Sequence, residues 1–221
     1  MRQTAVAFDA EDLKLEGVLG LPDQGPGPFP GVVLCHPHPL RGGNMNNNLV
    51  LSVYHGLVEA GFAALRFNFR GVGNSQGTHT EGELEVRDAE AALRTLGEAE
   101  GVDPARLGIA GYSFGTGVIL RNLSGYPSAR SIVLFSPPVR FLEHAEIDAD
   151  PRPKLFVCGD RDESVPVEPL KERLESMGGP VEWRIAEGVD HFWWDREAEA
   201  VAHAVEFFAR TLGRPSAREE S

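Results

Sequence analysis

Cysteine is scarce in this chain, with only Cys35 and Cys158 among its 221 residues. Each lies inside a short apolar run, VVLC or KLFVC, of the kind that forms a buried strand. A buried cysteine behaves as a small hydrophobic residue, and two of them cannot form the framework of a disulfide-rich secreted domain. We therefore expect reduced cysteines in the core and a cytoplasmic protein.

Long apolar runs and an excess of positive charge are lacking too. No run approaches the ~20 residues of a membrane-spanning helix, and the opening MRQTAVAFDAEDLKLE has early acids instead of a signal peptide's apolar stretch. The 33 acidic residues outnumber the 21 basic ones, which gives a net charge of −12. That charge repels phosphate backbones and anionic headgroups, so we expect neither nucleic acid nor a membrane as a partner.

Internal repeats, low-complexity linkers and blocks of like charge are also absent from the sequence. Nothing in it marks a domain boundary, and the length is sufficient to bury a substantial core. We predict one domain over residues 1–221, in which 213–221 forms a disordered tail.

The apolar segments that are present alternate in type. Residues 4–8 and 13–21 are typical of two strands joined by a polar turn. Continuous apolar runs, as in strands buried on both faces, follow at 31–35, 62–69, 106–112, 131–136, 154–159 and 181–186. Segments with helical periodicity lie between them, at 47–60, 83–97, 114–123, 166–177 and 196–212. This order predicts an α/β fold, a mostly parallel eight-stranded sheet with an N-terminal antiparallel hairpin and helices on both faces.

A G-x-S-x-G pattern, Gly111 to Gly115, stands between the strand at 106–112 and the helix that follows. Glycines suit a turn too sharp for flanking side chains, and the serine of such a turn is strained and exposed. The N-terminus of the following helix favours a developing negative charge. The pattern makes Ser113 a candidate nucleophile.

A serine hydroxyl needs a base, and the base needs an acid to orient it. The strand at 154–159 is followed by three candidate acids, Asp160, Asp162 and Glu163. The strand at 181–186 is followed by His191, the candidate base. Because functional residues gather at the carboxyl ends of parallel strands, we expect these side chains to meet Ser113.

These motifs make the chain resemble the α/β-hydrolase superfamily over residues 4 to 212. It is most similar to compact bacterial hydrolases that carry an HPHP loop and an RFNFRGVGNSQG stretch, here 66–77. The family pattern G-x-x-D-x-x-V-P implies that Asp162 is the acid of a Ser113–Asp162–His191 triad, with Asp160 in a structural role. In the stretch from Arg70 to Gly77 we expect a tight loop braced by Arg70 and not a nucleotide site.

The HPHP loop places His36 and His38 one residue apart. Such a pair can bind zinc, but no further ligand stands near it in a metal-binding pattern, so we predict no metal and no organic cofactor. The resemblance implies that this loop supplies an oxyanion donor. Because proline has no N–H, the donor among residues 37–39 would be His38, acting with the N–H of Phe114.

The segment 137–153 is short, whereas many relatives insert a helical lid there. We expect an open site with no lid domain. Side chains near the motifs are predicted to form a partly apolar substrate pocket: His36, Leu40, Met45, Val139, Phe141, Val165 and Trp193.

These observations favour a serine hydrolase that cleaves small carboxylic esters or thioesters through an acyl-enzyme. A hydrolase of small peptides or acyl-aminopeptides is one alternative, and a non-catalytic binding protein on the same scaffold is another. The sequence leaves the physiological substrate, the oligomeric state and the role of His79 open.

Overall fold

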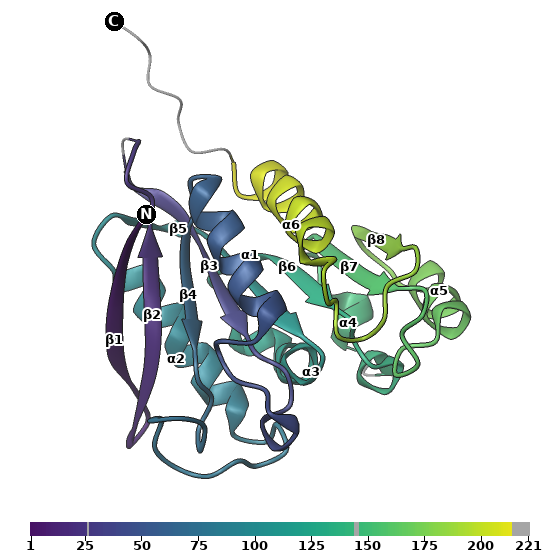
Figure 1. Cartoon of the computed structure of the whole chain (residues 1–221), viewed down its shortest axis with the longest axis horizontal. Coiled ribbons are helices and arrows are strands. Elements are labelled where there is room, and N and C mark those ends of the chain that lie inside the picture. Colours follow the sequence, from purple (N-terminus) through teal and green to yellow (C-terminus); the bar gives the residue numbers. More distant parts are fainter. Residues whose placement is uncertain (26, 144–145, 214–221) are drawn as a thin grey trace, which may run out of the picture.

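The computed structural model describes residues 1–25, 27–143 and 146–213, so the predicted tail lies outside the described residues from position 214 on. An eight-stranded sheet runs through the molecule in the order β1-β2-β4-β3-β5-β6-β7-β8 (Figure 1). Its strands are β1 (Arg2–Ala10), β2 (Leu13–Leu21), β3 (Phe29–Cys35), β4 (Ala63–Phe67), β5 (Val102–Tyr112), β6 (Ala129–Phe135), β7 (Lys154–Gly159) and β8 (Val181–Ala186).

The sheet confirms the predicted mixture of strand directions. β1 pairs with β2 and β2 pairs with β4 in antiparallel registers. The pairs from β4 through β3, β5, β6 and β7 to β8 are all parallel. The carboxyl ends of the parallel strands therefore share one edge of the sheet, where the predicted site residues stand.

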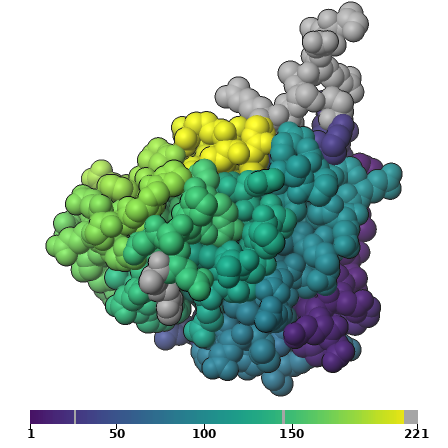
Figure 2. Space-filling model, turned by 180° about the vertical axis from the view of Figure 1, so that it is seen from behind, coloured from purple at the N-terminus to yellow at the C-terminus, as the bar shows by residue number. Residues whose placement is uncertain are grey.

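Helices cover both faces of the sheet. On one face, α1 (Asn48–Glu59) packs against α6 (Glu197–Thr211), so closely that a Cβ on Gly56 would lie 2.2 Å from Val201. The other face carries α2 (Glu85–Glu98), α3 (Phe114–Arg121) and α5 (Val167–Glu175). Seen from behind (Figure 2), this second face shows α2 and α3 in blue to teal between the purple N-terminal strands and the green C-terminal part.

Short helical turns complete the described part of the chain. They are the 3-10 turns η1 (Pro39–Arg41), η2 (Leu123–Gly125) and η3 (Val139–Glu143), together with α4 (Glu146–Ala149). The segment after β6 thus holds no lid domain among the residues that the structure describes. Among those residues, no helix combines the length and the apolar character that crossing a membrane requires.

β4 ends at Phe67, earlier than the apolar run to residue 69 predicts. The β2–β4 ladder stops here because Glu16 N donates to Oγ of Ser75 at 3.1 Å instead of to Asn68, whose carbonyl accepts from that hydroxyl. Asn68 N donates to the carbonyl of Glu16 at 3.0 Å, and Phe69 N donates to Nε2 of His36 at 3.1 Å. The chain then turns into the loop at 70–77.

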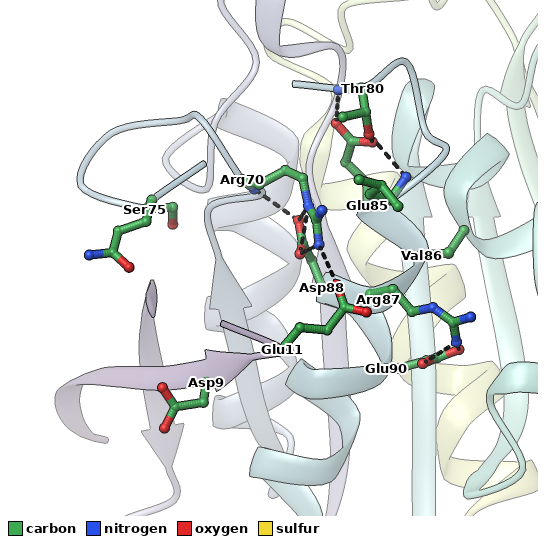
Figure 3. A network of polar contacts seen from close by, with 12 residues as sticks. Asp9, Glu11, Arg70, Ser75, Thr80, Glu85, Val86, Arg87, Asp88 and Glu90 are labelled. Carbon is green, nitrogen blue, oxygen red and sulfur yellow. Dashed lines mark hydrogen bonds and ion pairs between the residues drawn. The ribbon is translucent and has the colours of Figure 1, made fainter. Parts of the chain in front are cut away.

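That loop is held by a buried ion pair (Figure 3). The guanidinium of Arg70 donates to the carboxylate of Asp88 at 2.7 to 3.1 Å, and the backbone N–H of Arg70 donates to the same carboxylate at 2.9 Å. Asp88 lies in the first turns of α2. The predicted bracing role of Arg70 is confirmed, since it ties the loop after β4 to the helix that follows.

His36 performs a similar task at the end of β3. Its side chain is fully buried, Nδ1 lies 2.7 Å from the carbonyl of Pro37, and Nε2 accepts from Phe69. The neutral ring with its proton on Nδ1 satisfies both contacts. Burial lowers the pKa of His36 from about 6.5 to about 4, so the ring is neutral near pH 7.

We expect His36 to make folding stability depend on pH. Because its folded pKa lies below its unfolded value, its contribution is intact above about pH 6.5 and is lost as the pH falls toward 4. At pH 5 the loss is roughly 2 kcal/mol. Urea unfolding at about pH 7.5 and pH 5 should therefore show a smaller pH-dependent loss in His36→Gln than in the wild type. Equal losses in the two proteins would contradict this assignment.

Candidate active site

Ser113 occupies a strained turn between β5 and α3. Its φ of 51° and ψ of −109° are rare for a residue with a side chain. The flanking glycines show why the turn is possible. A Cβ on Gly111 would lie 2.7 Å from the carbonyl of Gly115, and a Cβ on Gly115 would lie 2.4 Å from the carbonyl oxygen of Cys35. Both glycines are therefore required by contact with backbone, not only by flexibility.

Ser113, His191 and Asp162 form a continuous hydrogen-bonded chain. Nε2 of His191 lies 3.0 Å from Oγ of Ser113, and Nδ1 lies 2.8 and 3.0 Å from the two carboxylate oxygens of Asp162. These contacts place the ring proton on Nδ1 and leave Nε2 to accept the serine proton. Three strand ends that are far apart in sequence thus meet as predicted, and their catalytic roles remain predictions.

The three candidate acids differ in their contacts. Asp162 is buried and accepts the backbone N–H groups of Ser164 at 2.9 Å and Val165 at 3.1 Å, which orients its carboxylate toward His191. Asp160 instead accepts from the N–H of Gly188 at 2.6 Å and so joins the loop after β7 to the loop after β8. Glu163 is exposed. This arrangement agrees with Asp162 as the orienting acid.

Tyr112 is a site residue that the sequence reasoning missed. Its hydroxyl donates to the carbonyl oxygen of His191, and its ring lies 5.7 Å from the imidazole. Burial raises the pKa of Tyr112, with the charge of Asp162 adding to the effect, so the phenol stays protonated and remains a donor. The sequence could have indicated Tyr112 because it occupies the variable position directly before the serine in G-x-S-x-G.

The HPHP loop folds back beside the serine turn. The carbonyl of His38 accepts from the N–H groups of Arg41 and Gly43, both at 3.0 Å, which closes the loop around η1. The ring of His38 packs against Phe114 with centroids 5.0 Å apart. Within the described part of the chain, the N–H groups of His38 and Phe114 donate to no protein acceptor. Both residues line the cleft that contains Ser113.

A cleft of about 580 Å³ opens over the serine. Ser113, His191 and Tyr112 line it, and polar residues make up a larger part of its wall than the sequence predicts. The lining residues are Pro37, His38, Arg41, Gly42, Gly43, Asn47, Glu81, Tyr112, Ser113, Phe114, Pro138, Arg140, Phe141, Ser164, His191 and Phe192. Phe141 lines the cleft as predicted. The aromatic side chain expected from Trp193 is supplied instead by the exposed Phe192.

The other predicted wall residues are corrected by the structure, because their side chains point elsewhere. Val165 and Trp193 are fully buried, and the indole N–H of Trp193 donates to Oγ of Ser136 at 3.1 Å. Val139 packs against the core, and the buried ring of His36 is held by Pro37 and Phe69 instead of lining the pocket. Leu40 is 72% exposed and, with Met45, borders a different hollow.

The expectation that no third metal ligand accompanies the HPHP histidines is wrong in one respect. His36 is committed to Phe69 and Pro37, but His38 lies with His79 and Glu81, whose ligand atoms are all within 4.8 Å of one another. His79 and Glu81 follow His38 by about forty positions, so no local spacing reveals the group.

Comparison with known sequences supports a hydrolase. The family model described as Dienelactone hydrolase family matches residues 15–211. An uncharacterized protein of Rickettsia prowazekii is 34% identical over 172 residues, which are 74% of this chain and 72% of that protein. Esterase EstD of Thermotoga maritima is 30% identical over 150 residues, which are 64% of this chain but only 35% of EstD.

Solved structures agree along nearly the whole chain. An alpha-beta serine hydrolase homologue from Coxiella burnetii has 31% identity and a TM-score of 0.79, covering 94% of this chain and 98% of that one. A serine hydrolase without lid from Xanthomonas campestris has 26% identity and a TM-score of 0.84, covering 98% and 97%. With the family model matched over almost all of its fold, the chain belongs to the Dienelactone hydrolase family and is a lidless α/β hydrolase.

Proposed function

We propose that this chain is a serine hydrolase that cleaves small carboxylic esters or thioesters through an acyl-enzyme. The observation that carries the proposal is the continuous hydrogen-bonded chain from Ser113 through His191 to Asp162 at the floor of an open cleft. The similarity to proteins described as serine hydrolases and esterases supports the same class. Because Cys35 and Cys158 are free and buried, we keep the cytoplasm as the proposed compartment.

In this mechanism Oγ of Ser113 attacks the carbonyl carbon while Nε2 of His191 takes its proton. The carbonyl oxygen becomes an oxyanion, which the N–H groups of Phe114 and His38 stabilise. His191 then gives the proton to the leaving alcohol or thiol, and the acyl group stays on Ser113. A water molecule, deprotonated by His191, attacks the acyl-enzyme and releases the carboxylic acid.

Each remaining contact has a role in that sequence. Asp162 holds the ring proton on Nδ1 and stabilises the imidazolium that forms after proton transfer. Tyr112 holds the backbone of His191 in place. The N-terminus of α3 also points toward the developing charge, since Phe114 is its first residue.

The first test identifies the nucleophile. Ser113→Ala should lose ester hydrolysis by at least about 10⁴-fold in kcat, because the attacking atom is removed. A fluorophosphonate probe should label the wild type and not this variant. Ser164→Ala, a serine in the same cleft that makes no contact with His191, should still be labelled. Activity of purified Ser113→Ala above a few per cent of wild type would remove Ser113 from the proposal.

The second test compares the two aspartates. Asp162→Asn should lower kcat by about 10⁴-fold, since an amide at this position favours the wrong tautomer of His191. Asp160→Asn keeps an oxygen that can accept from Gly188 and should lose about tenfold at most. The measurement is kcat on one activated ester for both variants. A larger loss in the residue-160 variant would reverse the two assignments.

The third test concerns acyl length. Because the charged residues Arg41, Arg140 and Glu81 are among those that line the cleft, long alkyl chains gain little burial there. On a series of nitrophenyl esters, kcat/KM should be highest for acetyl to butyryl and lower for octanoyl by about tenfold or more. Aminoacyl arylamides should be turned over far more slowly. If an arylamide were the best substrate, the peptide-hydrolase alternative would replace the ester assignment.

A further inference from the structure

Three side chains beside the cleft form a group that the hydrolytic mechanism does not use. They are His38 on the HPHP loop, and His79 and Glu81 on the loop that leads into α2. Nε2 of His38 lies 3.4 Å from one carboxylate oxygen of Glu81, and Nε2 of His79 lies 3.3 Å from the other. Two imidazoles and one carboxylate are therefore directed at a common point.

These separations match the ligand spacing of a tetrahedral metal ion. Zinc binds imidazole nitrogen and carboxylate oxygen at about 2.0 to 2.2 Å. In a tetrahedron with arms of that length, neighbouring ligand atoms are about 3.3 to 3.5 Å apart. Each imidazole already lies at this distance from one oxygen of Glu81, the two oxygens being different, and the whole set lies within 4.8 Å. Only small side-chain rotations are needed to complete the geometry.

The protonation pattern of His38 also allows binding. Its Nδ1 accepts from the N–H of Leu40 over a long 3.3 Å contact. Binding a metal through Nε2 moves the ring proton to Nδ1 and gives up that contact, which is among the longer hydrogen bonds of the loop.

His79 is the member whose surroundings most call for a ligand. Its side chain is nine-tenths buried, and within the described residues both ring nitrogens lack a hydrogen-bond partner. Nδ1 lies 2.8 Å from the carboxylate of Glu85, but the alignment falls short of a hydrogen bond. A histidine that binds metal through one nitrogen commonly faces a carboxylate with the other, which fixes the ring.

Glu85 is held rigidly for that supporting role (Figure 3). Its carboxylate accepts from the N–H and hydroxyl of Thr80, at 2.8 and 2.6 Å, and from the N–H of Gly82 at 2.9 Å. The same contacts fix the loop that carries His79 and Glu81.

The charge balance of the group also calls for a cation. Among the ion pairs of the described residues, Glu81 and Glu85 contact histidines only. Two carboxylates thus converge on His79 without a lysine or arginine between them. An ion also has routes of access, because His38 and Glu81 line the cleft of about 580 Å³ and His79 lines a neighbouring hollow of about 540 Å³.

We propose that His38, His79 and Glu81 bind a divalent transition-metal ion of the zinc type, with a fourth coordination position open to the cleft. Imidazole with one carboxylate is a ligand set for zinc, nickel or copper and not for magnesium, which prefers oxygen ligands. The ion joins the HPHP loop to the loop before α2. This proposal does not rest on the proposed hydrolysis, whose nucleophile, base and donors all belong to the chain.

The experiment is a calorimetric titration of zinc into tag-free, chelator-treated full-length protein. We expect one site per chain with a dissociation constant in the micromolar range or below, and no binding of magnesium. Zinc should also raise the Tm of the wild type, because it binds the folded state. Absence of zinc binding would overturn the proposal.

Variants locate the ion. His79→Gln and Glu81→Gln should each weaken zinc binding by at least tenfold, as expected for loss of a ligand. The control is His203→Gln, a half-buried histidine on α6 far from the group, which should bind zinc like the wild type. Glu81 is exposed, so its variant tests the site even if His79→Gln fails to fold. Equal affinity in the wild type and Glu81→Gln would overturn the assignment.

Discussion

The close contact of Gly115 with the backbone at the end of β3 is the constraint on which the rest of the site depends. A Cβ at Gly115 would overlap the carbonyl of Cys35 at 2.4 Å and approach that of His36 at 2.9 Å. The serine turn can therefore rest directly against the HPHP loop. That contact brings Phe114 and His38 into the cleft that holds Ser113, as the proposed pair of oxyanion donors requires.

A second close approach positions the base and the acid. A Cβ on Gly159 would lie 2.0 Å from the carbonyl of Val189, so the loops after β7 and β8 touch backbone to backbone. Arg161 N donates to Val189 O at 2.9 Å, and Asp160 secures the same contact through Gly188. Tyr112 then links this pair of loops to the serine turn. The hydrogen-bonded chain from Ser113 to Asp162 is thus positioned by contacts that end on the backbone of these loops.

Much of this could be predicted because the signals are local. Buried strands appear as continuous apolar runs, and the turn at Ser113 needs its glycines within two residues. The pocket wall could not be predicted in the same way, because it depends on side-chain direction. Trp193 has a φ of 62°, which turns the chain so that its indole enters the core while Phe192 is left at the cleft. Nothing in the tripeptide Phe192-Trp193-Trp194 indicates that choice.

The grouping of His38 with His79 and Glu81 was beyond sequence reasoning for a different reason. The loop that carries His79 is shaped by Arg70, Asp88 and Glu85, three buried charged residues whose partners become clear only in three dimensions. Inspection of the residues next to the H-x-H pair finds His36, but both nitrogens of His36 already contact Pro37 and Phe69. The proposed ligand set instead comes from two loops about forty positions apart in the sequence.

Oxyanion stabilisation and metal binding can share the HPHP loop because they use different atoms of His38. The proposed oxyanion donor is the backbone N–H, whereas the ion would be held by Nε2 of the side chain. Pro37 and Pro39 restrict the backbone on both sides of His38, so moving its imidazole by a rotamer change need not move its amide. The ring nonetheless packs against Phe114, the residue that supplies the other donor. An ion that holds this ring would therefore restrict the side chain of Phe114, and so act on hydrolysis through packing without taking part in the chemistry.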